Sequence, residues 1–275
     1  MVAFPRIKPY TYQSTNRANN TKSLGFTRLT GEEGDAMPDE FPDSGDEILS
    51  DEADERELAR ALEELAECRK ASPPDDREIG NRLLHIGRLL RDRSEFESAI
   101  DRLREAEGIF ARTENYIMSA GTKAELSGVY REMEQYDKAE EVLHEAIAID
   151  VKLGDDWDMA GHYNDLSLIF DARGNSEEAE RCLLKAIELA EKAGDQINVA
   201  TGYTNLCQLH KQRGDWAGAE QWIRKALEIE ERLDNKPMLA LTYDYLSQIY
   251  EARGDLLEAK RWLEKAIETD KQGDS

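Results

Sequence analysis

The 275-residue sequence is poor in the features that mark membrane and secreted proteins. Aromatic residues make up only 7% of it, and no apolar run approaches the roughly 18 residues that a transmembrane helix needs. The N-terminus lacks the charged-then-apolar pattern of a secretory signal. The three cysteines include no CxxC pair, so they predict reduced thiols, not a disulfide framework or a zinc site. These absences together predict a cytoplasmic protein.

Basic residues are also in deficit, but unevenly. The chain has 36 Lys and Arg against 59 Asp and Glu, a net charge of -23. Residues 1–30 nevertheless carry five basic residues and no acid, or +5, which leaves -28 for residues 31–275. Because so acidic a body repels phosphates, we expect neither nucleic acid nor a membrane surface as its partner.

The first 50 residues show no sustained hydrophobic period and are predicted to be a disordered tail, basic over 1–30 and acidic over 31–50. Two alternatives remain open for the basic segment, which carries aromatic residues between its charges. It could be an arm that docks on a partner or on the acidic remainder of the chain. It could also be a targeting segment, although its Pro and Asn content disfavours an amphipathic helix.

Motifs of catalysis and metal binding are missing from the sequence. It contains no HExxH, P-loop, GxGxxG or nucleophile elbow. The four histidines are scattered, and we expect His210 to be a packed core residue and Cys182 and Cys207 to be buried. Acid pairs such as Asp155–Asp156 are interpreted as solvated surface. We therefore expect no enzyme activity, no catalytic residue, no metal and no cofactor.

What the chain does have is a 40-residue period without insertions. Three columns of small residues recur at this interval: Gly87, Ser127, Ser167, Cys207 and Ser247; Ala99, Ala139, Ala179, Ala219 and Ala259; Ala106, Ala146, Ala186, Ala226 and Ala266. A fixed period in this range is typical of a solenoid, in which each unit buries its apolar face against its neighbours. Residues 51–275 are therefore predicted to form one repeat array.

Each unit is predicted to hold two helices. Between Ala160 and Phe170 the apolar residues recur at three-to-four residue spacing, which places them on one helix face. Gly174 then interrupts the helix, as Gly214 and Gly254 do in the next units. Glycine is favoured at such a break because the turn requires a positive φ.

The order of residue types within a unit resembles the tetratricopeptide repeat: a small residue, an aromatic one three later, then Gly, Ala and a further Ala. Here it reads Ser247, Tyr250, Gly254, Ala259, Ala266. The 40-residue length is similar to repeats of LGN-type adaptors and kinesin light chains. The early units depart from the pattern, because Ser94 and Glu134 replace the turn glycine and Lys123 replaces a tyrosine.

The resemblance implies an all-α fold, a right-handed superhelix or α-solenoid of five helix-turn-helix repeats. The predicted repeats span about 78–119, 120–159, 160–199, 200–239 and 240–271. Ala59 and Ala66 stand 40 residues before two alanines of the columns, so residues 53–70 are predicted to be an N-terminal capping helix. At the other end, Thr269 replaces an apolar column, which predicts a polar outer face on the last unit.

By the same resemblance, a partner segment binds in the concave groove lined by the first helix of each unit. The residues expected there are Glu125, Asn164, Asp165, Leu168, Thr204, Asn205, Gln208, Asp244, Tyr245 and Gln248. Amide side chains can both donate to and accept from a peptide backbone, and the acids favour Lys or Arg on the partner. Asp165 and Asp244 are expected to be exposed.

Co-chaperone members of the family grip a C-terminal carboxylate with a clamp of Lys, Asn and Arg. The matching places here hold Leu84, Arg88, Glu125, Gly161 and Asp165, so a chaperone-tail binder is not expected. The sequence predicts a non-enzymatic interaction scaffold or adaptor for a protein or peptide partner. The alternative is a peptide- or signal-sensing regulator that acts on a separate output partner. Residues 1–50 are too short and too polar for a DNA-binding output domain, which favours the scaffold.

Overall fold

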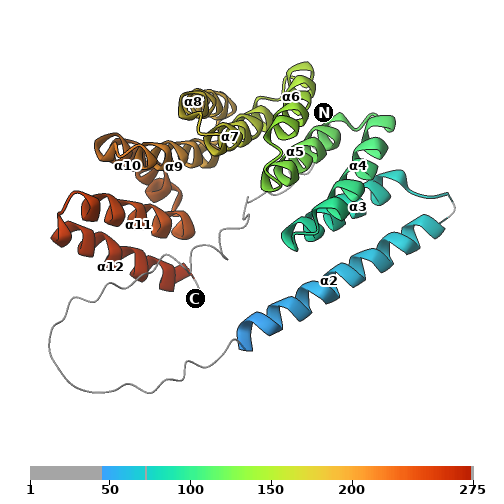
Figure 1. The fold of residues 1–275 in the computed structure, drawn as a ribbon, viewed down its shortest axis with the longest axis horizontal. Coiled ribbons are helices and arrows are strands. Elements are labelled where there is room, and N and C mark those ends of the chain that lie inside the picture. The colour runs from blue at the N-terminus through green and yellow to red at the C-terminus, as the bar shows by residue number, and fades with distance from the viewer. Residues whose placement is uncertain (1–44, 72, 274–275) are drawn as a thin grey trace. The chain divides into compact units, whose positions relative to one another are not determined.

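The structure, a computed structural model, describes residues 45–71 and 73–273, which form helices without any strand (Figure 1). The helices are α2 (Gly45–Lys70), α3 (Asp76–Asp92), α4 (Phe96–Arg112), α5 (Tyr116–Glu132), α6 (Tyr136–Leu153), α7 (Asp156–Ala172), α8 (Ser176–Ala193), α9 (Gln196–Gln212), α10 (Trp216–Leu233), α11 (Lys236–Ala252) and α12 (Leu256–Gly273). The all-α prediction is confirmed for these residues. The predicted tail over residues 1–44 lies outside them.

The chain divides into two units, residues 1–57 and residues 58–275. In the first unit the structure describes the start of α2, which begins at Gly45 and not at residue 53 as predicted. In the second unit the rest of α2 packs through Ala61 and Leu65, each 3% exposed, so it has the character of the predicted cap.

The second unit is built from five helix pairs in constant register. Each odd-numbered helix from α3 to α11 packs on the even-numbered helix that follows it, and that helix packs on the next odd-numbered one. The odd-numbered helices from α5 onward begin at Tyr116, Asp156, Gln196 and Lys236, which are 40 residues apart. The predicted five-repeat array is confirmed.

The small-residue columns lie where the helices cross. Ala99, Ala139 and Ala219 are 0% exposed, and Ala179 is 1% exposed. A Cβ atom added to Gly87 would lie 2.7 Å from Leu103 Cδ2. Because side chains at these crossings are minimal, paired helices approach closely and the large apolar residues fill the space on either side.

The turns within the pairs adopt the backbone conformation that the sequence predicted. Gly174, Gly214 and Gly254 have φ values of +75°, +74° and +81°. Ser94 and Glu134, which replace glycine in the first two pairs, adopt the same conformation with φ values of +60° and +59°. The left-handed region costs a non-glycine residue about 1–2 kcal/mol, so the surrounding helix packing imposes it there.

The odd-numbered helices line one side of the stack. Among the described residues, α3 contacts α5, α5 contacts α7 and α7 contacts α9, whereas no two successive even-numbered helices approach as closely. The odd-numbered helices therefore converge. We call their exposed surface on α3, α5, α7, α9 and α11 the inner face; it corresponds to the predicted groove.

Candidate functional site

The inner face begins with an acid held by two arginines. Arg88 Nε lies 2.7 Å from Glu125 Oε1, and Arg91 Nη1 lies 2.7 Å from Glu125 Oε2. The Glu125 side chain is 20% exposed. The expectation that Glu125 is exposed is therefore wrong, because α3 supplies cations that cover it; its role as a partner contact stays a prediction.

Amide side chains continue the inner face from α7 to α11. Asn205 Nδ2 donates to Asn164 Oδ1 at 2.7 Å, and Tyr245 Oη donates to Gln208 Oε1 at 3.2 Å. The Nζ atom of Lys211 lies 4.4 Å from the centre of the Tyr245 ring. The predicted residues are thus brought together, but part of their hydrogen-bonding capacity joins one repeat to the next.

Asp244 belongs to the same network on α11. Its Oδ2 accepts from Gln248 Nε2 at 2.6 Å, and Gln248 Oε1 accepts in turn from Lys211. Burial raises the pKa of Asp244, and the Gln248 hydrogen bond only partly offsets this. The expectation that Asp244 is exposed is wrong: the side chain is half-buried, beside the Lys211 side chain that reaches from α9 to Gln248 and Tyr245.

Asp165 on α7 differs from the other two inner-face acids. Its carboxylate accepts no hydrogen bond and forms no ion pair within residues 45–71 and 73–273. It is half-buried and not exposed as predicted. Burial raises the pKa of Asp165 to about 6, although His162 and Arg131 act in the opposite direction. Asp165 is therefore an acid in the middle of the inner face with its hydrogen-bonding capacity unused.

Two further predicted contacts are less accessible than expected. Thr204 is 5% exposed, so the expectation that it is exposed is wrong. Its Oγ1 donates to the Ala200 carbonyl at 3.1 Å, which satisfies the hydroxyl on the backbone of its own helix. Leu168 is half-buried, while Gln208 and Gln248 are exposed.

A buried acid–histidine pair at the junction of α6 and α7 was not predicted. His162 Nδ1 lies 2.6 Å from Asp150 Oδ2, and the residues are 5% and 0% exposed. Burial alone lowers the pKa of His162, but the hydrogen bond and negative charge of Asp150 outweigh it, so the pKa is raised. The available signal was an acid in a column that holds the apolar residues Phe110 and Ala190 in two other units, followed twelve residues later by a histidine.

A second buried acid occupies the same column at the junction of α10 and α11. Glu230 is 1% exposed, and neither of its carboxylate oxygens has a hydrogen-bond partner among the described residues. Burial raises the pKa of Glu230 to about 6. This residue too was missed, since the chain contains many acids that are solvated.

His210 and the buried cysteines have the packing roles that the sequence predicted. His210 Nε2 accepts from Trp222 Nε1 at 3.1 Å, so Nδ1 carries the proton that faces Asp215 Oδ2 at 2.8 Å. Burial raises the pKa of the Cys207 thiol to about 12 and that of Cys182 to about 11. Such thiols are poor nucleophiles at neutral pH. No cluster of three potential metal ligands occurs within the described part of the chain.

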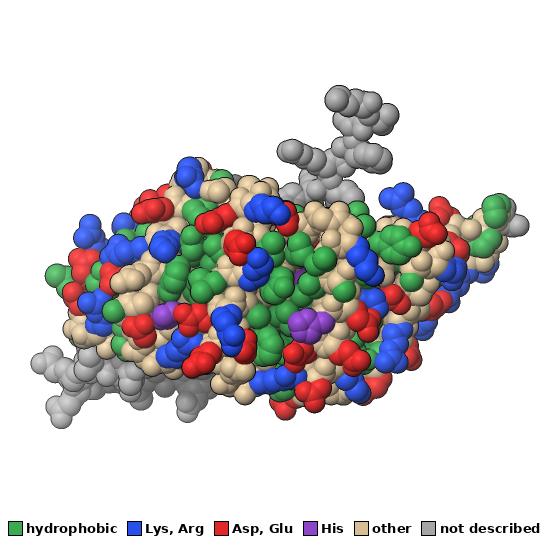
Figure 2. Space-filling view, turned by 90° about the horizontal axis from the view of Figure 1, so that it is seen from above, with side chains coloured by type: hydrophobic (Ala, Val, Ile, Leu, Met, Phe, Trp, Pro, Cys, Tyr) green, Lys and Arg blue, Asp and Glu red, His purple; other side chains and the backbone are tan. Residues whose placement is uncertain are grey.

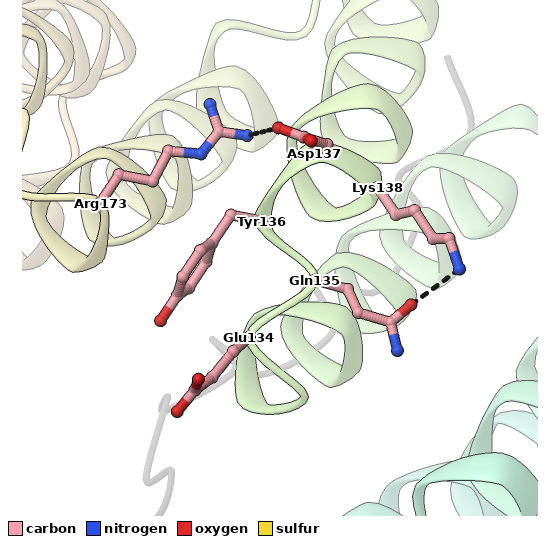
Figure 3. A pocket seen from close by; sticks show the side chains of 6 residues that line it. All are labelled: Glu134, Gln135, Tyr136, Asp137, Lys138 and Arg173. Atoms are coloured by element: carbon pink, nitrogen blue, oxygen red, sulfur yellow. Dashed lines mark hydrogen bonds and ion pairs between the residues drawn. The ribbon is translucent and has the colours of Figure 1, made fainter.

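A shallow cavity of about 400 Å³ lies beside the start of α6 (Figure 3). Its lining residues are Glu134, Gln135, Tyr136, Asp137, Lys138 and Arg173. Figure 3 shows the Arg173 guanidinium directed at Asp137, at 2.6 Å, while Lys138 donates to Gln135 at 2.7 Å. Four of the six lining side chains are therefore paired with one another.

Elsewhere on the surface, charges of both signs alternate. In Figure 2, Lys and Arg side chains lie among Asp and Glu, with hydrophobic side chains grouped between them. One arrangement recurs in three pairs: an arginine at the turn meets a glutamate of the preceding pair, as Arg173 does with Glu140 at 2.6 Å. None of the helices in the described ranges is long and apolar enough to cross a membrane.

Solved structures with the same fold are repeat proteins. One is BtubC (BKLC) from P. vanneervenii, with 24% identity over 81% of this chain and 93% of that chain and a TM-score of 0.70. Another is a putative kinesin light chain from Podosopora anserina with nearly identical TPR-like repeats. It is 18% identical over 73% of this chain and 99% of that chain, with a TM-score of 0.58.

A third is a STAND protein with a tetratricopeptide repeat sensor from Pyrococcus horikoshii. It shows 22% identity over 70% of this chain and 29% of that longer chain, with a TM-score of 0.62. No curated protein matches the sequence significantly. The profile of the MalT-like TPR region, however, matches residues 72–275, which include all five helix pairs. The chain therefore belongs to the family of MalT-like tetratricopeptide-repeat regions.

Proposed function

We propose that this chain is a non-enzymatic, cytoplasmic interaction scaffold whose inner face binds a partner segment containing Lys or Arg. Tetratricopeptide-repeat proteins generally mediate protein–protein interaction, and the finer proposal rests on one observation. Of the three acids predicted to lie on the inner face, Glu125 is held by two arginines and Asp244 by Gln248, but Asp165 has no partner within the described residues. A cation from a partner would supply the missing interaction.

The neighbours of Asp165 support a peptide as the ligand. The hydrogen bond between Asn205 Nδ2 and Asn164 Oδ1 leaves Asn205 Oδ1 and Asn164 Nδ2 without partners among the described residues. One is an acceptor and the other a donor, as a peptide unit requires. The contact set proposed is Asn164, Asp165, Asn205, Asp244 and Tyr245.

The charge of the face also disfavours an acidic ligand. A C-terminal carboxylate placed beside Asp165 would meet a like charge in a partly desolvated site, which is unfavourable. The Arg88 and Arg91 contacts with Glu125 already use the cations nearest to it on α3. This is why we do not propose a chaperone-tail binder.

The test is a substitution of the unpaired acid. Partners captured by the full chain would be identified by mass spectrometry, and their Lys- or Arg-containing segments titrated calorimetrically. Asp165→Asn is expected to weaken binding at least about tenfold, because a charge-assisted hydrogen bond contributes about 1.5–3 kcal/mol. Added salt should weaken the wild-type complex as well.

Asp137→Asn is the matched control, because Asp137 is fully exposed and lies on α6, away from the inner face. It should leave the affinity unchanged. Equal binding by wild type and Asp165→Asn would remove the inner face as the site. The complex should also tighten as pH rises through about 6, since Asp165 must be ionised to pair with a cation.

The second candidate is a peptide- or signal-sensing regulator. The description of the Pyrococcus horikoshii relative as a sensor supports it. The two proposals differ in what a short peptide does alone. A scaffold only holds it, whereas a regulator changes its affinity for a second protein when the peptide saturates the inner face.

A further inference from the structure

Helix α12 exposes the apolar residues that the other even-numbered helices bury. The column Leu103, Leu143, Leu183 and Ile223 is 0–2% exposed, but its next member, Leu263, is 39% exposed. In the neighbouring column, Ile187 is 6% and Leu227 is 8% exposed, whereas Ile267 is 48% exposed. The predicted polar outer face on the last unit is thus wrong for these two columns, although Thr269 and Asp270 follow it.

The cause is a missing neighbour. In the other pairs the next odd-numbered helix packs on these positions, as α11 does on α10. The described residues contain no helix that plays this part for α12. Leu256, Lys260, Leu263, Ile267 and Asp270 are spaced three and four apart, so they form one stripe along α12. We call these five residues the α12 stripe.

We propose that the α12 stripe binds the α12 stripe of a second copy of this chain, with the two helices antiparallel. An antiparallel pair that sets Leu263 opposite Ile267 of the second copy also sets Lys260 opposite Asp270 of the second copy, because both pairs share a midpoint at residue 265. The twofold axis repeats each contact. Two apolar layers are thereby flanked by two layers of opposite charge.

This arrangement reproduces the packing that the chain already uses. Helix α11 packs on α10, on which Ile223 and Leu227 are buried, and the second α12 would cover their counterparts Leu263 and Ile267. Lys260 is available for it, since its nearest acid is Glu264 of the same helix at 3.8 Å. A single helix pair buries less than the roughly 1,200 Å² of a standard interface, so the dimer should be concentration-dependent.

Sedimentation velocity of the full chain over a wide concentration range tests this proposal. The wild type should shift from monomer to dimer. Ile267→Lys should raise the dissociation constant at least about tenfold, because it puts a charge into an apolar layer. Leu257→Lys is the matched control, since Leu257 lies on the same helix, is 79% exposed and is not in the stripe; it should dimerise like the wild type.

Charge exchange tests the orientation. Lys260→Asp should weaken the dimer, and adding Asp270→Lys to the same chain should restore it. Circular dichroism would show that each variant remains folded, as expected for exposed positions. A wild type that stays monomeric throughout, an Ile267→Lys variant that dimerises normally, or a Leu257→Lys variant that is equally impaired would each overturn the proposal. These outcomes are independent of the inner face.

Discussion

The α6–α7 junction and the α10–α11 junction bury an acid at the same position of the repeat, but they treat it differently. Asp150 at the first junction meets His162, which stands twelve residues later, at 2.6 Å. Glu230 at the second junction has Thr242 at the corresponding place, and neither its carboxylate nor the Thr242 hydroxyl has a hydrogen-bond partner in the described residues. The same backbone geometry therefore holds a hydrogen-bonded acid–histidine pair at one junction and an acid without a hydrogen-bond partner among the described residues at the other.

The difference shows that a buried acid at one junction of the solenoid is compensated, or left uncompensated, independently of the acid at another junction. A repeat contacts only its neighbours, so a polar group at one junction must be compensated there. His162 has a raised pKa and Glu230 has a pKa raised to about 6, yet the causes differ. The Asp150 charge favours the protonated histidine, whereas burial disfavours the ionised glutamate and the nearby Thr242 offsets this only in part.

Removing His162 from the first junction should destabilise the protein and have the largest effect on stability of the changes considered. In His162→Leu the Asp150 carboxylate remains buried without a counter-charge, which is expected to cost about 3–5 kcal/mol. Urea unfolding followed by circular dichroism would measure the loss. The double variant Asp150→Leu/His162→Leu is the control and should recover most of it. A single variant as stable as the wild type would show that the pair contributes nothing.

Neutralising Glu230 at the second junction should raise the free energy of unfolding instead of lowering it. Glu230→Gln is expected to stabilise the protein by about 2 kcal/mol at pH 8, because a pKa of about 6 in place of 4.5 corresponds to that penalty for the ionised form. At pH 4, where the glutamate is protonated in both states, the gain should vanish. Glu228→Gln, at an exposed site of the same helix, is the control and should have no such effect.

Between pH 5 and pH 8, Glu230 by itself should cost the wild type a smaller amount of stability. Glu230 binds its proton more tightly when folded, so stability present below pH 4.5 is lost as pH rises through about 6; this accounts for about 1 kcal/mol of the interval. Asp158 and Asp165, with pKa values of about 6, act in the same direction.

His162, whose folded pKa is raised above 6.5, adds a further loss at higher pH. Thermal unfolding across this range, compared between wild type and Glu230→Gln, would separate the contributions. The variant should show the shallower dependence on pH. Parallel curves for the two proteins would contradict the assignment of Glu230.

Much of the fold was predictable because the repeat is local. The alanine columns, the turn conformation at Gly174 and the spacing of helix starts all follow from contacts within a unit and with the adjacent one. The positive φ of Ser94 and Glu134 could be anticipated only because they occupy the repeat position of the turn glycines, since neither residue favours this conformation.

The sequence could predict which residues lie on the inner face, but not how exposed they are or which partners they bind. The sequence placed Glu125, Asp165 and Asp244 on it, yet treated them as equivalent acids. Their partners come from neighbouring helices: Arg88 and Arg91 stand 37 and 34 residues from Glu125 along the chain. Such contacts depend on how closely odd-numbered helices converge, which the period does not specify.

The sequence by itself determined the architecture: an acidic chain with five 40-residue units, two helices in each, and small residues where the helices cross. That follows because helix periodicity and steric size act locally and repeat in every unit. Only the tertiary structure decided which charges are compensated: within the described residues it leaves Asp165 and Glu230 without hydrogen-bond partners, pairs Asp150 with His162, and exposes Leu263 and Ile267. These outcomes depend on the identity and distance of groups on neighbouring helices, because electrostatic and hydrophobic energies are set by what surrounds a side chain.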